Sequence, residues 1–163
     1  MPAGLSREVE AKARILAESL AVACGLIGVL TAELFLMPDG SLVVNELAPR
    51  VHNSGHWTIE GAVTSQFEQH VRAICGLPLG STDMRTRAAA MVNLLGEGDR
   101  RQAALTGVPA ALEAADVHLH LYDKREVFER RKMGHVTALG DSVEQALERA
   151  RGARAKLDWG AGG

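Results

Sequence analysis

Two apolar stretches on either side of a tight turn constrain the fold of this chain most. Residues 26–36 (LIGVLTAELFL) are apolar except for Thr31 and Glu33, and residues 41–47 (SLVVNEL) contain adjacent valines that favour a strand. Between them, residues 37–40 (MPDG) have the composition of a tight turn. The pattern predicts a β-hairpin with a glutamate in the middle of its first, otherwise apolar strand.

The position of Glu33 depends on the register of this hairpin. An unpaired buried carboxylate is costly, so Glu33 either faces solvent or has a partner. If residues 37–40 form the loop, Glu33 lies opposite Val44, and Glu46 lies one diagonal step away on the same face, about 7–8 Å between backbone positions. A three-residue loop with a glycine bulge instead places Asn45 beside Glu33. The first register brings two carboxylates together as a magnesium ion requires, whereas on a wet outer face both are merely solvated.

Polar and ionisable residues follow the second strand directly. Arg50 has a planar cationic group suited to phosphate or carboxylate, and His52 and His56 exchange protons or hydrogen bonds near neutral pH. The same loop adds hydrogen-bonding groups and a flexible backbone at Asn53, Ser54 and Gly55. A loop this polar beyond paired carboxylates is typical of a binding or catalytic site. Trp57, which follows it, is expected to pack, and lining of the pocket is the alternative.

Capping residues and apolar periodicity predict three helices, which begin after Ser6, Ser65 and Ser142. Further strands are predicted at residues 86–96, 117–122 and 133–140. The final stretch, residues 157–163 (LDWGAGG), is expected to fray. A mild boundary at residues 76–83 (GLPLGSTD) divides the chain into two domains, residues 1–80 and residues 81–163. The elements together predict an α+β fold, with a helix, hairpin, site loop and helix in the first domain.

Composition excludes several classes of partner. The formal net charge of -2 offers no electrostatic attraction for nucleic acid or an anionic membrane, and 4% aromatic residues provide few stacking platforms. No apolar run reaches the ~18 residues of a membrane span, and the N-terminal stretch lacks the apolar core of a signal peptide. The expected compartment is therefore the cytoplasm. Cys24 and Cys75 are accordingly expected to be buried thiols rather than a disulfide.

Residues 45–80 (NELAPRVHNSGHWTIEGAVTSQFEQHVRAICGLPLG) resemble the 5-(carboxyamino)imidazole ribonucleotide synthases, the ATPase subunits of the bacterial phosphoribosylaminoimidazole carboxylase of purine biosynthesis. Residues 5–47 and 132–140 also fit the ATP-grasp fold of that family. The resemblance implies an α+β fold made of the second ATP-grasp lobe, an antiparallel sheet with helices, and a small C-terminal β-rich domain. Other ATP-grasp ligases, such as biotin-carboxylase-like enzymes, and a non-catalytic nucleotide-binding or dimerisation fragment are the alternatives.

The resemblance also implies which residues bind ATP and magnesium. Glu33 and Glu46 correspond to the magnesium ligands, and Asn45 joins them in binding ATP. Arg50 and His52 correspond to catalytic residues near a carboxyphosphate intermediate. Asn53 and Ser54 complete the substrate pocket. The implied ligase uses ATP and bicarbonate to make carboxyphosphate and then carboxylates the exocyclic amine of 5-aminoimidazole ribonucleotide, with cations around the transferred phosphoryl group.

A second basic cluster corresponds to the part of the family that binds the phosphate of the ribonucleotide: Tyr122, Lys124, Arg131 and Lys132. Here the sequence departs from the family pattern, because residues 128–130 (FER) replace the usual Arg-Pro-Gly. That departure removes one phosphate-binding arginine, for which Arg125 or Arg130 is the available substitute. On the neighbouring strands, His118 and His120 are expected to be structural, whereas His135 is equally compatible with a structural role and with a role in this cluster.

Members of this family are roughly twice as long as this chain and have further N-terminal domains. The expected partners are therefore the missing N-terminal half and a second copy in a homodimer. ATP lies between two lobes in this fold, so the isolated chain is expected to be inactive. The first helix and residues 26–36 are also expected to leave apolar surface uncovered.

Overall fold

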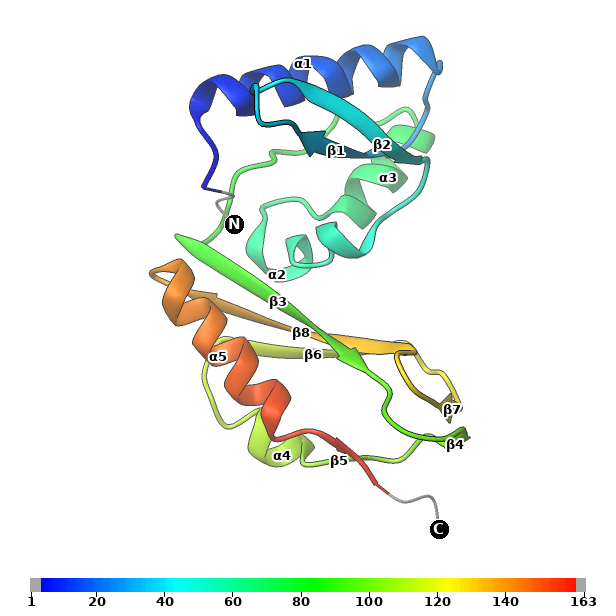
Figure 1. Cartoon of the computed structure of the whole chain (residues 1–163), viewed down its shortest axis with the longest axis vertical. Helices are drawn as coiled ribbons and strands as arrows, with labels where there is room; N and C mark the ends of the chain where they lie inside the picture. Colours follow the sequence, from blue (N-terminus) through cyan, green and yellow to red (C-terminus); the bar gives the residue numbers. More distant parts are fainter. Residues whose placement is uncertain (1–3, 161–163) are drawn as a thin grey trace. The chain divides into compact units, whose positions relative to one another are not determined.

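The computed structural model describes residues 4–160, which form two compact units (Figure 1). The boundary between the units lies between Asp83 and Met84. We call residues 4–83 the N-terminal unit and residues 84–160 the C-terminal unit. In the described part of the chain, no helix is long and apolar enough to cross a membrane.

The N-terminal unit consists of three α-helices, a hairpin and one 3-10 turn. Its elements are α1 (Arg7–Ala23), β1 (Thr31–Leu36), β2 (Leu42–Ala48), η1 (Asn53–Gly55), α2 (Thr58–Gly61) and α3 (Gln66–Ile74). The predicted caps are confirmed, because the hydroxyls of Ser6 and Ser65 accept hydrogen bonds from the main-chain N–H groups of Val9 and Glu68. Gly25 ends α1 in the left-handed conformation, with φ of 57°.

The hairpin forms, and next to the turn it has the predicted register of the three-residue loop, but a bulge changes the pairing at Glu33. The first strand begins at Thr31 rather than at residue 26. Next to the turn, Leu34 pairs with Val44, and an irregularity between Leu34 and Glu33 then skips one residue of β2. Glu33 therefore lies directly opposite Glu46, rather than opposite Val44 or Asn45. The extra residue of a β-bulge leaves no mark in the apolar pattern, so the sequence did not indicate it.

Little of the N-terminal unit is buried. Its buried residues are Ala48, Gly61, Ala62 and Thr64, and α1 contributes none. Ile15 and Val22 on α1 are 64% and 82% exposed, and Phe35 on β1 is 55% exposed. The predicted apolar surface on the first helix and strand is therefore confirmed.

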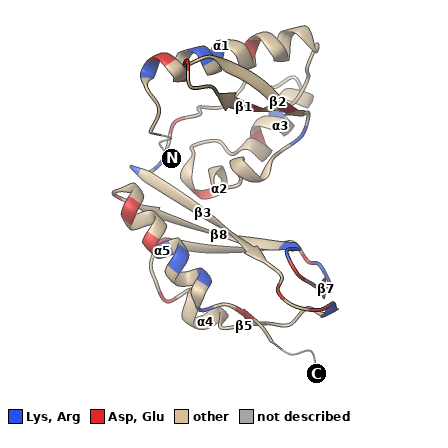
Figure 2. Ribbon diagram, viewed as in Figure 1, with Lys and Arg blue, Asp and Glu red and all other residues tan. Residues whose placement is uncertain are grey.

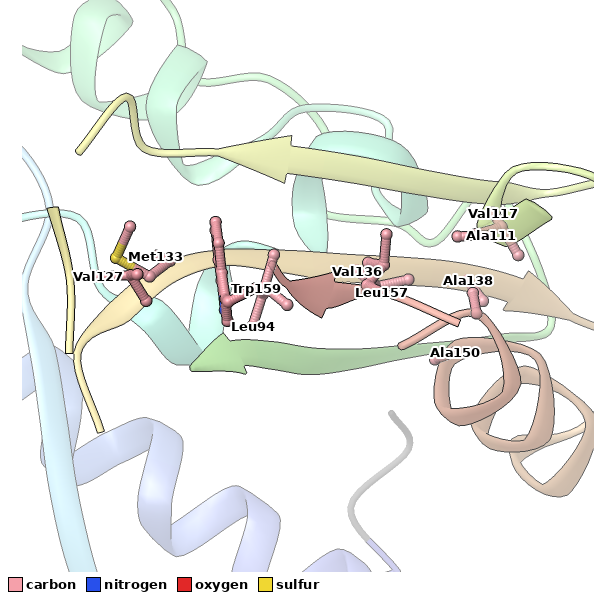
Figure 3. Close-up of a cluster of buried hydrophobic side chains, with 11 residues drawn as sticks. Leu94, Ala111, Val117, Val127, Met133, Val136, Ala138, Ala150, Leu157 and Trp159 are labelled. Atoms are coloured by element: carbon pink, nitrogen blue, oxygen red, sulfur yellow. The ribbon is translucent and has the colours of Figure 1, made fainter. Parts of the chain in front are cut away.

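The C-terminal unit is built around a three-stranded antiparallel sheet covered by one helix. The sheet has the order β3 (Ala88–Leu95), β8 (Lys132–Gly140), β6 (Val117–Leu121), and α5 (Val143–Ala155) packs against β3 and β8. Short elements complete the unit: β4 (Arg101–Gln102), β5 (Leu105–Thr106), α4 (Val108–Ala111), β7 (Glu126–Val127) and β9 (Asp158–Trp159). Two-stranded pairs join β4 to β7 and β5 to β9. The core lies between these elements (Figure 3), and its largest fully buried apolar side chains are Leu94, Val127 and Val136.

The predicted fraying of the C-terminal stretch is wrong for its described residues. Leu157 and Trp159 are 3% and 6% exposed, and both belong to the core cluster. The indole N–H of Trp159 donates to the carbonyl of Leu95 at 2.8 Å, which ties β9 to β3. Residues 161–163 lie outside the described part. The glycines at the end of the chain suggested a loose tail, whereas one large aromatic side chain is enough to anchor it.

The prediction of buried thiols is also wrong. Cys24 and Cys75 are free and exposed. Each is the C-cap residue of a helix, α1 or α3, and these helix ends lie at the surface of the N-terminal unit. Their apolar neighbours in sequence suggested burial, but few side chains of this unit are buried.

We expect both thiols to react rapidly with Ellman's reagent in the native 163-residue chain. Cys24→Ser and Cys75→Ser should each remove one fast-reacting thiol, because exposure gives the reagent access to both. Stopped-flow absorbance without denaturant measures this reaction. Thiols that react only after addition of guanidinium would contradict the exposed positions.

Candidate functional site

Two opposed carboxylates on the hairpin form the centre of the site in the N-terminal unit. Because Glu33 and Glu46 are direct cross-strand partners, their side chains leave the same face of the sheet. Like charges in this arrangement destabilise a hairpin unless a cation or a hydrogen-bond donor offsets them. The carboxylate of Glu33 is accessible, with 43% of its side chain exposed. The hairpin thus presents two oxygen ligands at one place.

A magnesium ion fits this donor set. Magnesium prefers oxygen ligands and is commonly held by one or two carboxylates, with waters and substrate phosphates filling its other positions. Among residues 4–160, no three or more histidine, cysteine, aspartate or glutamate side chains come together as a metal site. Any magnesium site among the described residues would therefore have at most two protein carboxylates as ligands.

His52 connects the polar loop to this pair. Its Nδ1 atom accepts a hydrogen bond from the main-chain N–H of Ser54 at 3.3 Å and lies 2.8 Å from the Ser54 hydroxyl. Because a main-chain N–H can only donate, Nδ1 is unprotonated and the ring hydrogen is on Nε2. The Nε2 atom lies 3.2 Å from a carboxylate oxygen of Glu33. His52 is thereby oriented by Ser54, with its Nε2 atom facing the carboxylate of Glu33.

The remaining predicted residues of this loop are less constrained. The guanidinium of Arg50 donates to the carbonyl of Val51 at 3.0 Å and is exposed, rather than bonded to the carboxylates. Asn45 is the residue that the bulge of β2 leaves without a cross-strand partner. Asn53 begins η1, and its carbonyl accepts a hydrogen bond from the main-chain N–H of His56 at 3.1 Å. Contacts therefore join Glu33, Glu46, His52 and Ser54, while Arg50 and Asn45 lie exposed beside them.

Gln66, at the start of α3, is a residue of this region that the sequence did not indicate. Its side-chain oxygen accepts from the main-chain N–H of His52 at 2.9 Å, and its amide nitrogen donates to the His52 carbonyl at 2.8 Å. The same nitrogen lies 2.9 Å from Nδ1 of His56. The only signal in the sequence was a polar residue directly after the Ser65 cap, which is unremarkable at a helix start. Trp57, expected to pack, lines a mainly apolar pocket together with Val29 and Ala62.

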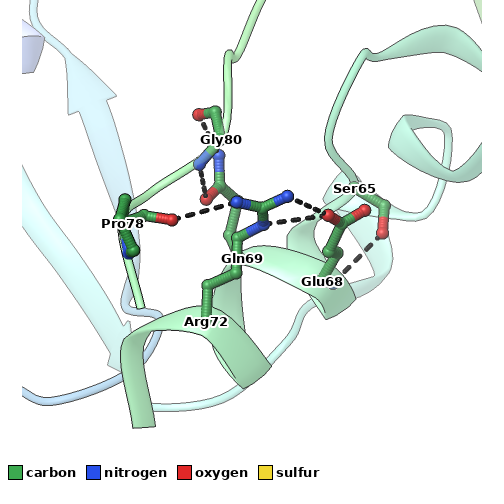
Figure 4. A network of polar contacts seen from close by, with 6 residues as sticks. All are labelled: Ser65, Glu68, Gln69, Arg72, Pro78 and Gly80. Carbon is green, nitrogen blue, oxygen red and sulfur yellow. Dashed lines mark hydrogen bonds and ion pairs between the residues drawn. The ribbon is translucent and has the colours of Figure 1, made fainter. Parts of the chain in front are cut away.

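A second glutamine on α3 holds a different loop in the same way (Figure 4). The Gln69 side chain donates to the carbonyl of Gly80 at 2.6 Å and accepts from its N–H at 3.0 Å. Arg72, one turn further on, bonds both Glu68 and the carbonyl of Pro78. The helix α3 therefore fixes two loops, one through Gln66 and one through Gln69.

In the C-terminal unit, three of the predicted phosphate-binding residues lie near the start of β8. The ammonium of Lys124 donates to the carbonyl of Lys132 and lies 5.8 Å from the ring centre of Tyr122. The Tyr122 hydroxyl lies 2.9 Å from Nδ1 of His135, which is buried and stacks on His120. Burial raises the pKa of Tyr122, so its phenol stays neutral near pH 7.

The fourth residue, Arg131, is held by the segment that departs from the family pattern. The guanidinium groups of Arg131 and Arg100 lie 4.9 Å and 4.5 Å from the ring centre of Phe128. Arg131 also donates to the carbonyl of Glu126 at 2.8 Å. Arg130 occupies a turn position, with φ of 62°. Figure 2 shows basic residues gathered beside β7, where β8 begins.

Two family models match this chain. The ATP-grasp domain model matches residues 1–67, and the phosphoribosylaminoimidazole carboxylase C-terminal domain model matches residues 89–149. Among curated proteins, the N5-carboxyaminoimidazole ribonucleotide synthase of Bacillus subtilis is 45% identical over 148 residues, which are 91% of this chain and 37% of the relative. The synthase of Brucella melitensis is 48% identical over 139 residues, 85% of this chain and 36% of the relative. The chain thus spans little more than a third of these relatives.

Solved structures of N5-carboxyaminoimidazole ribonucleotide synthases are also similar to this chain. The crystal structure of N5-carboxyaminoimidazole ribonucleotide synthetase from Thermotoga maritima is 47% identical, with a TM-score of 0.89 over 96% of this chain and 44% of that one. The N5-carboxyaminoimidazole synthase of Aspergillus clavatus, in complex with ADP and 5-aminoimidazole ribonucleotide, is 34% identical with a TM-score of 0.79, over 93% of this chain and 40% of that one.

Proposed function

We propose that this chain, which has the ATP-grasp fold and is homologous to the C-terminal part of the N5-carboxyaminoimidazole ribonucleotide synthases, contributes to an ATP-dependent carboxylation in purine biosynthesis. The proposed substrates are 5-aminoimidazole ribonucleotide, bicarbonate and ATP. The γ-phosphoryl group of ATP passes to an oxygen of bicarbonate, which yields carboxyphosphate and ADP. Carboxyphosphate breaks down to phosphate and carbon dioxide. The exocyclic amine then attacks carbon dioxide and loses a proton, which gives the carbamate product.

The opposed pair of Glu33 and Glu46, with the ring of His52 against one of them, is the observation that supports this proposal most. We assign Glu33 and Glu46 as ligands of magnesium. The same two residues and Asn45 are assigned to the binding of ATP. When bound, magnesium neutralises charge on the phosphates during phosphoryl transfer. The Nε2 atom of His52 lies 3.2 Å from the Glu33 carboxylate, and this contact helps to orient the proposed ligand before nucleotide binds.

The loop beyond the hairpin suits an anionic intermediate. Arg50 offers an exposed guanidinium, which binds carboxylate or phosphate oxygens with two parallel hydrogen bonds. We assign Arg50 and His52 to the catalytic step, and Asn53 and Ser54 to binding of the substrate. In the C-terminal unit, we assign the ribonucleotide phosphate to the basic cluster: Tyr122, Lys124, Arg131 and Lys132.

Phe128 offsets the loss of the usual Arg-Pro-Gly by orienting Arg131, and this role leads to a prediction. Phe128→Leu removes a cation–π contact worth about 0.5–1 kcal/mol. We expect the KM for the ribonucleotide to rise roughly two- to fivefold, with kcat nearly unchanged, because each 1.4 kcal/mol of binding corresponds to about tenfold. Phe128→Tyr keeps the aromatic ring and is the matched control. Equal kinetics for Phe128→Leu and the wild type would show that the ring does not orient Arg131.

The relatives are much longer than this chain, and this difference bears on whether the 163 residues alone can be active. We propose that the 163 residues alone do not turn over ATP, and that an N-terminal part supplies the remaining nucleotide contacts. The exposed apolar side chains of α1 and β1 support an interface with that part or with a second copy of the chain.

ADP release by the natural polypeptide that contains this chain tests the proposed function. We expect release in the presence of magnesium and ATP to be stimulated by 5-aminoimidazole ribonucleotide. A different ATP-grasp ligase would show no stimulation by the ribonucleotide but would respond to another acceptor. Robust ATP hydrolysis by the 163 residues alone would overturn the proposal that they are insufficient.

A further inference from the structure

The amide of Gln66 has a fixed orientation, because its two ends meet main-chain groups of opposite character. The oxygen accepts from the N–H of His52 at 2.9 Å, and the nitrogen donates to the carbonyl of the same residue at 2.8 Å. Exchanging the two amide atoms would place donor against donor and acceptor against acceptor. The assignment therefore follows from the backbone of His52 and not from a choice of rotamer.

This orientation determines the state of His56. The amide nitrogen of Gln66 can only donate, and Nδ1 of His56 lies 2.9 Å from it. Nδ1 must then accept, so the ring is neutral and its hydrogen is on Nε2. The imidazole of His56 also stacks on Phe67, with ring centres 5.5 Å apart. Both the tautomer and the plane of this ring are therefore set by two consecutive residues of α3.

Gly55 leaves room for this arrangement. A Cβ atom at residue 55 would lie 2.5 Å from the side-chain oxygen of Gln66, which is closer than real Cβ atoms come. The hydroxyl of Thr58 adds further links, since it donates to the carbonyl of Gly55 and accepts from the N–H of Gln66 at 3.0 Å. The loop from residue 52 to residue 58 is thus fastened to the first turn of α3 at several points.

We propose that Gln66 is a positioning residue, which fixes both the path of the site loop at His52 and the tautomer of His56. The path of this loop matters for catalysis, because the groups of a site act only when they are held in the productive geometry. This inference rests on the proposed function for its catalytic consequence. The tautomer of His56 and the clamp on His52 are properties of the N-terminal unit itself.

The first test is the tautomer. In ¹⁵N-histidine-labelled protein, long-range ¹H–¹⁵N spectra separate protonated from unprotonated ring nitrogens, and His56→Asn identifies the signals of His56. We expect an unprotonated Nδ1 and a protonated Nε2 above neutral pH. Gln66→Glu replaces the donor by an acceptor, so the proton should move to Nδ1. This variant should still fold, because an acidic residue is favourable in the first turn of a helix.

Gln69→Glu is the matched control, because it breaks the equivalent clamp on Gly80 from the same helix and should leave the His56 signals unchanged. A protonated Nδ1 in the neutral wild-type ring, or identical tautomers in Gln66→Glu and the wild type, would overturn the inference.

The second test is kinetic and uses the natural polypeptide. Gln66→Met, which has similar size but no hydrogen bonds, should lower kcat by up to about 10²-fold, the typical effect of misplacing site groups by about 1 Å. The KM for the ribonucleotide should rise by a smaller factor than kcat falls, because Asn53 and Ser54 lie in the clamped loop whereas the phosphate is assigned to the other unit. An unchanged kcat in Gln66→Met would show that the clamp has no catalytic role. If the wild type makes no ribonucleotide-dependent product, the proposed function fails, while the tautomer result still stands or falls by itself.

Discussion

Glu46→Gln should lower the ribonucleotide-dependent turnover of the natural polypeptide by about 10²–10³-fold, comparable with removing one group that stabilises transition-state charge. The substitution keeps the size and hydrogen-bonding shape of the side chain but removes one charge from the pair with Glu33. Higher magnesium concentrations should restore part of the activity, because the remaining carboxylate still binds the ion. Initial rates of ADP release over a magnesium titration measure both effects.

The same variant should change stability in the opposite direction. Like charges directly opposite on antiparallel strands are destabilising, so without magnesium Glu46→Gln should leave stability equal or raise it by up to about 1 kcal/mol. Glu18→Gln on the exposed surface of α1 is the control for the loss of one negative charge. A variant that loses stability and activity together would indicate that Glu46 is structural rather than a ligand.

Trp159→Ala should destabilise the C-terminal unit by about 3–5 kcal/mol, the usual cost of truncating a large buried aromatic residue. The side chain is 6% exposed, lies in the core cluster and bonds the carbonyl of Leu95. Chemical unfolding of the 163-residue chain, followed by circular dichroism, measures the change in the free energy of unfolding. The loss should be confined to the transition of this unit if the two units unfold separately.

Trp159→Phe separates packing from hydrogen bonding. It retains most of the apolar surface but leaves the Leu95 carbonyl without its indole partner, so we expect a smaller loss of about 1–3 kcal/mol. A change of less than 1 kcal/mol in Trp159→Ala would contradict the anchoring of β9 in the core.

Local signals predicted the helix ends well. The serine caps of α1, α3 and α5 depend on a side chain and an N–H three residues later, so the sequence contains all the information that they need. The hairpin was only partly predictable. Its strands and turn were clear, whereas the bulge that places Glu46 opposite Glu33 depends on pairing that alternation does not encode.

Contacts between distant residues could not be predicted from one sequence. The side chain of Gln66 bonds the main chain of His52, which lies 14 positions earlier. A main-chain partner has no signature in the sequence. Phe128 looked like a loss of a phosphate-binding residue, but its ring lies beneath Arg131. The predictions of a frayed Trp159 and a buried Cys24 were wrong for the same reason, since burial depends on which surfaces the fold brings together.

The most direct measurement is ¹³C NMR of the natural polypeptide incubated with ¹³C-bicarbonate, magnesium, ATP and 5-aminoimidazole ribonucleotide. The proposed carboxylation predicts a new carbamate signal that requires ATP and forms in step with ADP, and that is nearly absent in Glu46→Gln. ADP formation at the full rate without any labelled carbamate would contradict the assignment of the site to carboxylation.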